Sequence, residues 1–198
     1  MVSRQKVLIQ LFHPLIHKSR VNRQLIESVN DLEGVTIRYM YDLYPDFSID
    51  IKEEQNLLEA NDVIVWQHPF YWYSSPSLLK EWIDIVLEHG FAYGRYGNSL
   101  SGKKVMTSIT AGGRREAYRE GGLRRFSIRQ LLAPFEQTVN LCNMQYLPPF
   151  VVHGTHLMDE KDIEGAGRDY RKVIRSLRDE IYSRDQLLGQ DYINDITG

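Results

Sequence analysis

Short apolar runs alternate with longer stretches of helical periodicity along this chain of 198 residues. Five runs have the length of a buried strand, and most are rich in β-branched residues. They are Val7–Phe12, Val35–Tyr41, Val63–Gln67, Val105–Thr110 and Tyr146–Val152. Because strands covered on both faces show continuous rather than alternating hydrophobicity, the pattern predicts a parallel sheet between two layers of helices.

Helical periodicity fills most of the intervals between these runs. Four stretches show apolar positions at helical spacing: Val21–Val29, Leu78–Leu87, Pro134–Asn143 and Ile163–Ile181. We expect Ser19 to cap the first stretch, and Ser75 to cap the second with Pro76 in its first turn. The strongest stripe, from Leu78 to Leu87, is amphipathic and should pack on the sheet.

The order of these elements predicts an α/β fold of the flavodoxin-like, doubly wound type. Right-handed crossovers would give five parallel strands with helices on both faces. We find no repeat and no linker rich in Gly, Ser or Pro, so we expect one domain over residues 1–198. Such a sheet binds its ligand beyond the carboxyl ends of its strands.

Composition and charge narrow the classes of function. A net charge of −2 argues against nucleic acid as a partner. The single cysteine, Cys142, excludes an internal disulfide framework. The apolar run near the N-terminus is too short for a signal segment or membrane span, so we expect a cytoplasmic protein. His68, His89, His153 and His156 lack metal-ligand spacing, and we predict no metal site.

The loop after the first run carries a candidate phosphate seat. It lacks a glycine-rich fingerprint, which argues against a dinucleotide-binding turn or a P-loop. Free amides and a positive dipole at the start of the following helix favour an anion. The candidate residues are His13, Ser19, Arg20, Val21 and Asn22. The alternative is an ordinary capped helix beside a solvated histidine.

The loop after the third run is an aromatic turn between two prolines, Pro69 and Pro76. Its candidate residues are Pro69, Phe70, Tyr71, Trp72 and Tyr73. The prolines restrict the backbone, so the turn can present amides and flat rings to a flavin. The alternative, compatible with the first, is an aromatic patch at a dimer contact.

The loop after the fourth run contains a pair of glycines. Its candidate residues are Thr110, Ala111, Gly112 and Gly113. Glycine lets a backbone approach a ligand closely, although a generic turn explains the pair equally well. All three loops fall on one edge of the predicted sheet, and this coincidence favours a ligand site there.

A basic segment follows the glycine pair. Residues 114–129 contain six arginines and two glutamates, a net charge of about +4. Such a segment can bind the 2′-phosphate of NADPH or attract anionic substrates. A solvated loop remains the alternative.

Several motifs together resemble the flavodoxin-like NAD(P)H:quinone oxidoreductases. They are His13–Asn22, Pro69–Pro76, Leu78–Asp84, His89–Gly94, Thr110–Gly113 and Leu147–Gly154. The resemblance spans roughly residues 5 to 180. It is nearest to the ancillary proteins of glutathione-regulated potassium-efflux systems and to the general stress protein 14 group.

The resemblance implies a homodimer that holds FMN in a cleft between subunits and reduces quinones with NADPH or NADH. The loop after the first run would hold the phosphate, the aromatic turn would line the isoalloxazine, and Thr110 to Gly113 would contact its edge. FAD is used by relatives with longer chains, so FMN is favoured. Tyr118 matches a tyrosine that the mammalian-type enzymes place over the flavin as a polar group, and it is the candidate catalytic residue. Arg124 stands where those enzymes have a histidine.

Two other functions stay open at this point. The protein could regulate a membrane potassium-efflux antiporter at the inner face of the membrane, as relatives in this branch do. It could also carry single electrons, although carriers of that kind are usually acidic and lack a wide aromatic cleft. For the dimer face, we consider the helix from Leu78 to Leu87 with the aromatics after it, because Trp82 exceeds what packing on the sheet needs.

Overall fold

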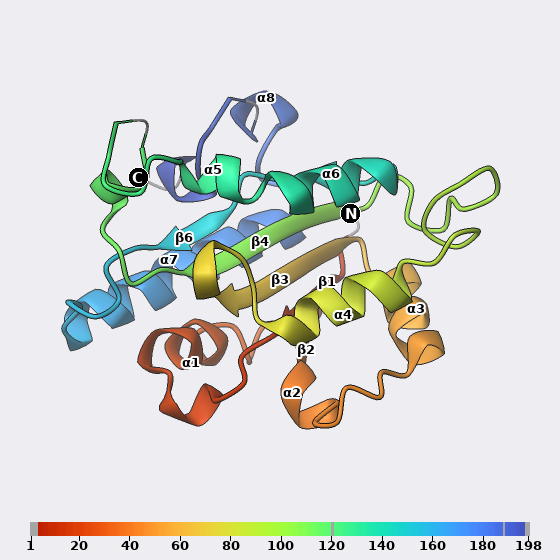
Figure 1. Ribbon diagram of the computed structural model, residues 1–198, viewed down its shortest axis with the longest axis horizontal. Helices are drawn as coiled ribbons and strands as arrows, with labels where there is room; N and C mark the ends of the chain where they lie inside the picture. The colour runs from red at the N-terminus through yellow and green to blue at the C-terminus, as the bar shows by residue number, and fades with distance from the viewer. Residues whose placement is uncertain (1–3, 120, 188, 197–198) are drawn as a thin grey trace.

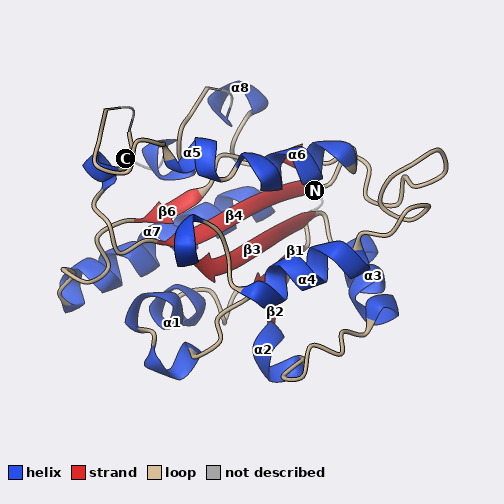
Figure 2. Ribbon diagram, viewed as in Figure 1, coloured by secondary structure: helices blue, strands red, loops and turns tan. Residues whose placement is uncertain are grey.

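The computed structural model describes residues 4–119, 121–187 and 189–196. Its core is a parallel sheet with the strand order β2-β1-β3-β4-β5, in which β6 also pairs with β4 (Figures 1 and 2). The strands are β1 Val7–Leu11, β2 Val35–Tyr39, β3 Val63–Pro69, β4 Lys104–Thr110, β5 Gln145–Tyr146 and β6 Phe150–Val152. This order confirms the predicted doubly wound α/β fold.

The fifth predicted strand is broken in two. Residues 147–149 separate β5 from β6, and both pieces run beside β4. Pro148 and Pro149 cause the break because neither has an amide hydrogen for the ladder. The second predicted strand also ends early, at Tyr39, since Met40 begins a short helix.

Helices cover both faces of the sheet (Figure 1). On one face lie α1 (Arg20–Glu27) and α7 (Glu160–Arg178), which pack on alternate residues of β1 such as Val7 and Ile9. The other face carries α2 (Met40–Leu43), α3 (Ile51–Ala60), α4 (Ser77–Val86), α5 (Ile128–Leu131) and α6 (Ala133–Leu141). The remaining helices are α8 (Arg184–Leu187) and the 3₁₀ turns η1 (Ile16–Lys18), η2 (Tyr71–Tyr73), η3 (Arg115–Ala117) and η4 (Ile193–Ile196).

Three expectations about the helices were wrong in detail. Ser75 does not cap α4: Pro76 occupies the N-cap position, and the Ser75 hydroxyl donates to the Pro76 carbonyl at 3.2 Å. The last long helix ends at Arg178, so Ile181 lies beyond it, exposed. Trp82 is fully buried, which excludes it from a dimer face.

A buried carboxylate on α3 joins this helix to the neighbouring strands and to α4. Glu54 is fully buried and accepts four hydrogen bonds, at distances between 2.7 and 2.9 Å. The donors are Gln10, Arg38, Tyr44 and Trp82. A buried charge is tolerated when it is paired and fully hydrogen-bonded, and these bonds tie α3 to β1, β2 and α4. The indole of Trp82 is therefore committed to the core.

No helix in the described part of the chain is long and apolar enough to cross a membrane.

Candidate functional site

The loops that follow β1, β3 and β4 are joined by hydrogen bonds at the carboxyl edge of the sheet. The side-chain nitrogen of Asn22, Nδ2, donates a hydrogen bond to the Thr110 hydroxyl at 2.8 Å, and its side-chain oxygen accepts one from Gln67 at 3.2 Å. Gln67 in turn accepts from the Tyr170 hydroxyl at 2.9 Å. The start of α1, the end of β3 and the end of β4 are thus held as one unit.

The start of α1 provides backbone amides next to this unit. The Ser19 hydroxyl accepts a hydrogen bond from the backbone amide of Asn22 at 3.3 Å and so caps the helix, as predicted. The amides of Arg20 and Val21 occupy the first turn, where no helix carbonyl is available and the dipole is positive. Asn22 is only 1% exposed, and its side chain holds the loops together.

His13 closes the other side of the first loop. Its Nδ1 accepts from the Leu15 amide at 3.1 Å, which leaves Nε2 as the protonated, donating nitrogen. Burial lowers the pKa of His13 below its usual value, so the ring is neutral at physiological pH. The ring centroid lies 6.4 Å from that of Tyr71, which brings the first loop against the aromatic turn.

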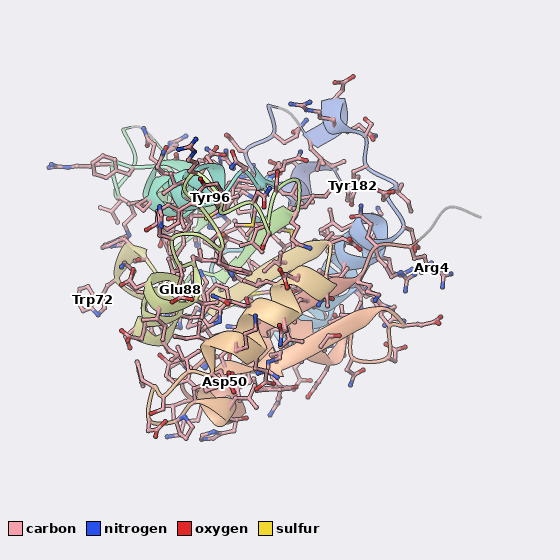
Figure 3. All side chains as sticks on the ribbon, turned by 90° about the vertical axis from the view of Figure 1, so that its right-hand side faces the viewer. Arg4, Asp50, Trp72, Glu88, Tyr96 and Tyr182 are labelled. Carbon is pink, nitrogen blue, oxygen red and sulfur yellow. The ribbon has the colours of Figure 1, made fainter. Side chains whose placement is uncertain are left out.

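The aromatic turn is held in an unusual backbone conformation. Phe70 continues the pairing of β3, because its backbone amide donates a hydrogen bond to the Thr110 carbonyl at 2.9 Å. Trp72 and Tyr73 then adopt φ values of 50° and 63°, which residues other than glycine rarely adopt. Trp72 is 93% exposed and projects from the body of the protein (Figure 3). Strain and exposure at adjacent aromatics indicate a functional turn.

A cavity of about 330 Å³ lies between the aromatic turn and the loop after β4. Its walls are Phe70, Trp72, Tyr73, Gly112, Gly113, Tyr118, Arg124 and His156. This volume lies at the lower end of the range for small-molecule sites, about 300–1,000 Å³. Flat aromatic walls with a few polar groups suit a planar heterocycle.

The two glycines make the close packing of this cavity possible. A Cβ atom on Gly112 would lie 2.5 Å from Nε2 of His156, and one on Gly113 would lie 2.8 Å from Cε2 of Tyr118. Both separations are shorter than any real contact between such atoms, so larger residues would displace the rings. Ala111 faces the core instead, at 1% exposure, and bonds to the Val152 carbonyl at 2.8 Å.

Tyr118 and Arg124 place polar groups in the same cavity. Burial raises the pKa of Tyr118, and the charge of Arg124 opposes this rise, so the phenol is protonated at neutral pH. Arg124 donates to the Tyr73 hydroxyl at 2.9 Å. Arg124 therefore lines the cavity next to Tyr118.

The sequence did not predict His156 as a cavity residue and indicated only that it lacks metal-ligand spacing. It follows β6 by four residues and so reaches the same edge of the sheet as the other loops. That position, just after the fifth apolar run, was the available signal. Among the described residues, no group of three or more His, Cys, Asp or Glu side chains is arranged to hold a metal.

Comparison with known proteins identifies the family. The profile of the flavodoxin-like fold family Flavodoxin_2 matches residues 5–174. This chain belongs to that family. A crystal structure described as general stress protein 14 in complex with FMN, from Treponema denticola, is 38% identical with a TM-score of 0.83. The match covers 87% of this chain and 99% of that one.

Two further structures of the family carry different descriptions. One, described as a thermophilic tryptophan halogenase from Streptomycin violaceusniger, is 42% identical with a TM-score of 0.83, over 84% of this chain and 97% of that chain. The other, described as an NADPH-quinone reductase from P. pentosaceus, is 29% identical with a TM-score of 0.78, over 85% and 96%. The descriptions as general stress protein 14 and as an NADPH-quinone reductase agree with the resemblance drawn from the sequence, whereas the description as a halogenase names a different reaction on the same fold.

Proposed function

We propose that this protein is an FMN-dependent oxidoreductase that takes electrons from NADPH or NADH and reduces quinones or similar electrophiles. One observation carries the proposal: an aromatic cavity with a glycine wall lies at the sheet edge where Asn22 ties the first turn of α1 to Thr110 at the end of β4. The relatives described as an FMN complex and as an NADPH-quinone reductase support the choice of cofactor and reaction.

The residues present fit FMN. The amides of Arg20 and Val21, with Nε2 of His13, would hold the phosphate, because all are donors and the helix dipole favours an anion. The ring system would lie against Gly112 and Gly113, where the missing Cβ atoms leave the backbone open. Pro69 would fix the start of the aromatic turn without contributing an amide.

The protein's own part in the reaction is to orient the reactants and place charge. The chemistry supplied by bound FMN would be hydride transfer from a nicotinamide to an acceptor, and the one cavity would admit the two in turn in a ping-pong cycle. Trp72 and Tyr73 would position planar reactants at the mouth. Arg124 would stabilise negative charge on a reduced acceptor, and the protonated hydroxyl of Tyr118 would donate a hydrogen bond to its oxygen.

A homodimer would complete this site. Three exposed apolar side chains lie on the aromatic turn and the loop after β4: Trp72 at 93%, Leu123 at 83% and Phe126 at 54%. Single exposed residues are ordinary, but three close to one cavity are typical of an interface. We propose that a second copy of the chain covers them and forms the outer wall of the cleft.

The deciding experiment is a visible spectrum of the purified protein, with the released flavin identified by mass. We expect one FMN per chain, bleaching on addition of NADPH and return of colour on addition of a quinone. As a control, Arg124→Met should retain FMN and lose turnover, because the phosphate seat lies in another loop. A colourless protein that takes up neither FMN nor FAD would contradict the proposal and favour the role of a regulatory subunit for an antiporter.

A further inference from the structure

The segment after α7 lies outside the part of the chain that the family profile matches, residues 5–174. It returns to the carboxyl edge of the sheet next to the loop that follows β4 (Figure 1). The Ile193 amide donates to the Pro149 carbonyl at 3.1 Å. The Asn194 side chain accepts from the Val151 amide at 2.8 Å and donates to its carbonyl at 3.2 Å. These bonds dock the segment on β6.

Once docked, the segment places Tyr192 at the end of a row of rings that reaches the cavity. Ring centroids are 5.5 Å apart between Tyr192 and His153, 5.7 Å between His153 and Tyr118, and 6.1 Å between Tyr118 and Phe70. Burial lowers the pKa of His153 to about 4, so the central ring is neutral at physiological pH. The row therefore acts through packing rather than through a charge.

An ion pair also joins this C-terminal segment to the loop that follows β4. Arg115 donates two hydrogen bonds of 2.7 Å to the Asp195 carboxylate and lies 4.7 Å above the Tyr192 ring. Arg115 begins η3, the 3₁₀ turn that immediately precedes Tyr118. A bidentate pair restricts orientation as well as distance, so it limits where η3 and Tyr118 can lie.

From this geometry we propose that Tyr192 and Asp195 are positioning residues that set the place of the Tyr118 phenol in the cavity. The inference rests on the proposed function, because it gives Tyr118 a task only if an acceptor binds there. It assigns a role in the reaction to a segment that the family profile does not include. Without this segment, η3 would lose the ion pair to Asp195, and His153, which packs on Tyr118, would lose its contact with Tyr192.

A first experiment tests positioning without the flavin. In the apoprotein, Asp195→Asn should raise hydrogen exchange of the amides at 115–119 by about 3- to 10-fold, since a tenfold change corresponds to about 1.4 kcal/mol of local stability. Asp31→Asn is the matched control, because Asp31 forms the same bidentate pair with Arg171. Equal exchange in both variants would overturn the proposal.

A second experiment separates positioning from general stabilisation. For quinone reduction, Asp195→Asn and Tyr192→Leu should lower kcat several-fold while FMN content stays at the wild-type level. In the Tyr118→Phe background, the further loss should fall below two-fold, because the group being positioned is gone. Losses that multiply fully in the double variants would overturn the proposal. If the wild type binds no flavin, the proposed function fails, whereas the exchange experiment still decides whether the segment holds η3.

Discussion

Gly112 and Gly113 set how closely two side chains from other segments approach the cavity. His156 lies over the first glycine and Tyr118 over the second, each too close to leave room for a Cβ atom. Neither glycine has the positive φ that would make glycine necessary for the backbone alone. Glycine is therefore needed at these two positions for steric reasons, because a Cβ atom would clash with the rings of His156 and Tyr118. Both rings also contribute polar groups to the cavity.

At Gly113, substitution by alanine should move Tyr118 and disturb the cavity without unfolding the protein. We expect Gly113→Ala to weaken FMN binding at least several-fold, measured by fluorescence titration. Gly165→Ala is the control, since its nearest neighbour would be 3.6 Å away, in helix α7. That variant should gain about 0.5–1 kcal/mol of stability and bind FMN normally. Unchanged FMN affinity in Gly113→Ala would show that the ring packing is not needed.

Among the elements, α1, β3 and β4 are joined at their functional ends by one buried amide. Asn22 gives a hydrogen bond to Thr110 and accepts one from Gln67, so the start of α1 and the glycine loop cannot shift independently. A buried polar group that loses its partner costs about 1–3 kcal/mol.

Asn22→Ala should lower the free energy of unfolding by about 1–3 kcal/mol and weaken FMN binding in the same variant, because both loops lose their alignment. Urea denaturation and FMN titration measure the two effects. Thr110→Val removes only one of the two side-chain bonds and should show a smaller loss of each. Loss of stability with unchanged FMN affinity would mean that the alignment does not matter for the cofactor.

The sequence predicted the strands well because their apolar runs reflect burial on both faces, and β1, β3 and β4 lie where expected. It placed the loops that form the cavity for the same reason, since each loop follows a strand. It did not predict His156 as a cavity residue or the return of Tyr192 to β6. The place of His156 just after the fifth apolar run was a signal left unused, whereas the return of Tyr192 depends on contacts between distant segments that no local pattern encodes. The break at Pro148 and Pro149 was readable from the missing amides.

For the whole molecule, buried histidines make stability depend on pH. Burial lowers the pKa of both His68 and His153 to about 4, whereas an unfolded chain has an ordinary histidine pKa of about 6.5. Between these values the unfolded state binds protons that the folded state does not. The stability from these groups is therefore complete above pH 6.5 and is lost as the pH falls towards 4.

Urea titrations from pH 8 to pH 4 should show this loss, with a slope of up to about 1.4 kcal/mol per pH unit for each histidine. His68→Leu should reduce the slope by the share of one histidine, because leucine takes up no proton. An unchanged slope in that variant would show that His68 is protonated in the folded protein.

Assembly is the other property of the whole molecule. Leu123→Glu should convert the expected dimer to monomers in sedimentation experiments, because the charge would be buried between two copies. Ile181→Glu provides the control: Ile181 is 63% exposed and follows the end of α7. A wild-type monomer at micromolar concentration, or dissociation of both variants alike, would contradict the proposed interface.

The docking of Asn194 on β6 also bears on aggregation. A sheet edge with free amides and carbonyls recruits strands from other chains. Here the Asn194 side chain occupies both polar groups of Val151, and Pro148 and Pro149 have no amide to offer. The carboxyl half of this edge is thereby closed to strand addition. The segment that packs behind Tyr118 thus also removes a place where a strand of another molecule could pair.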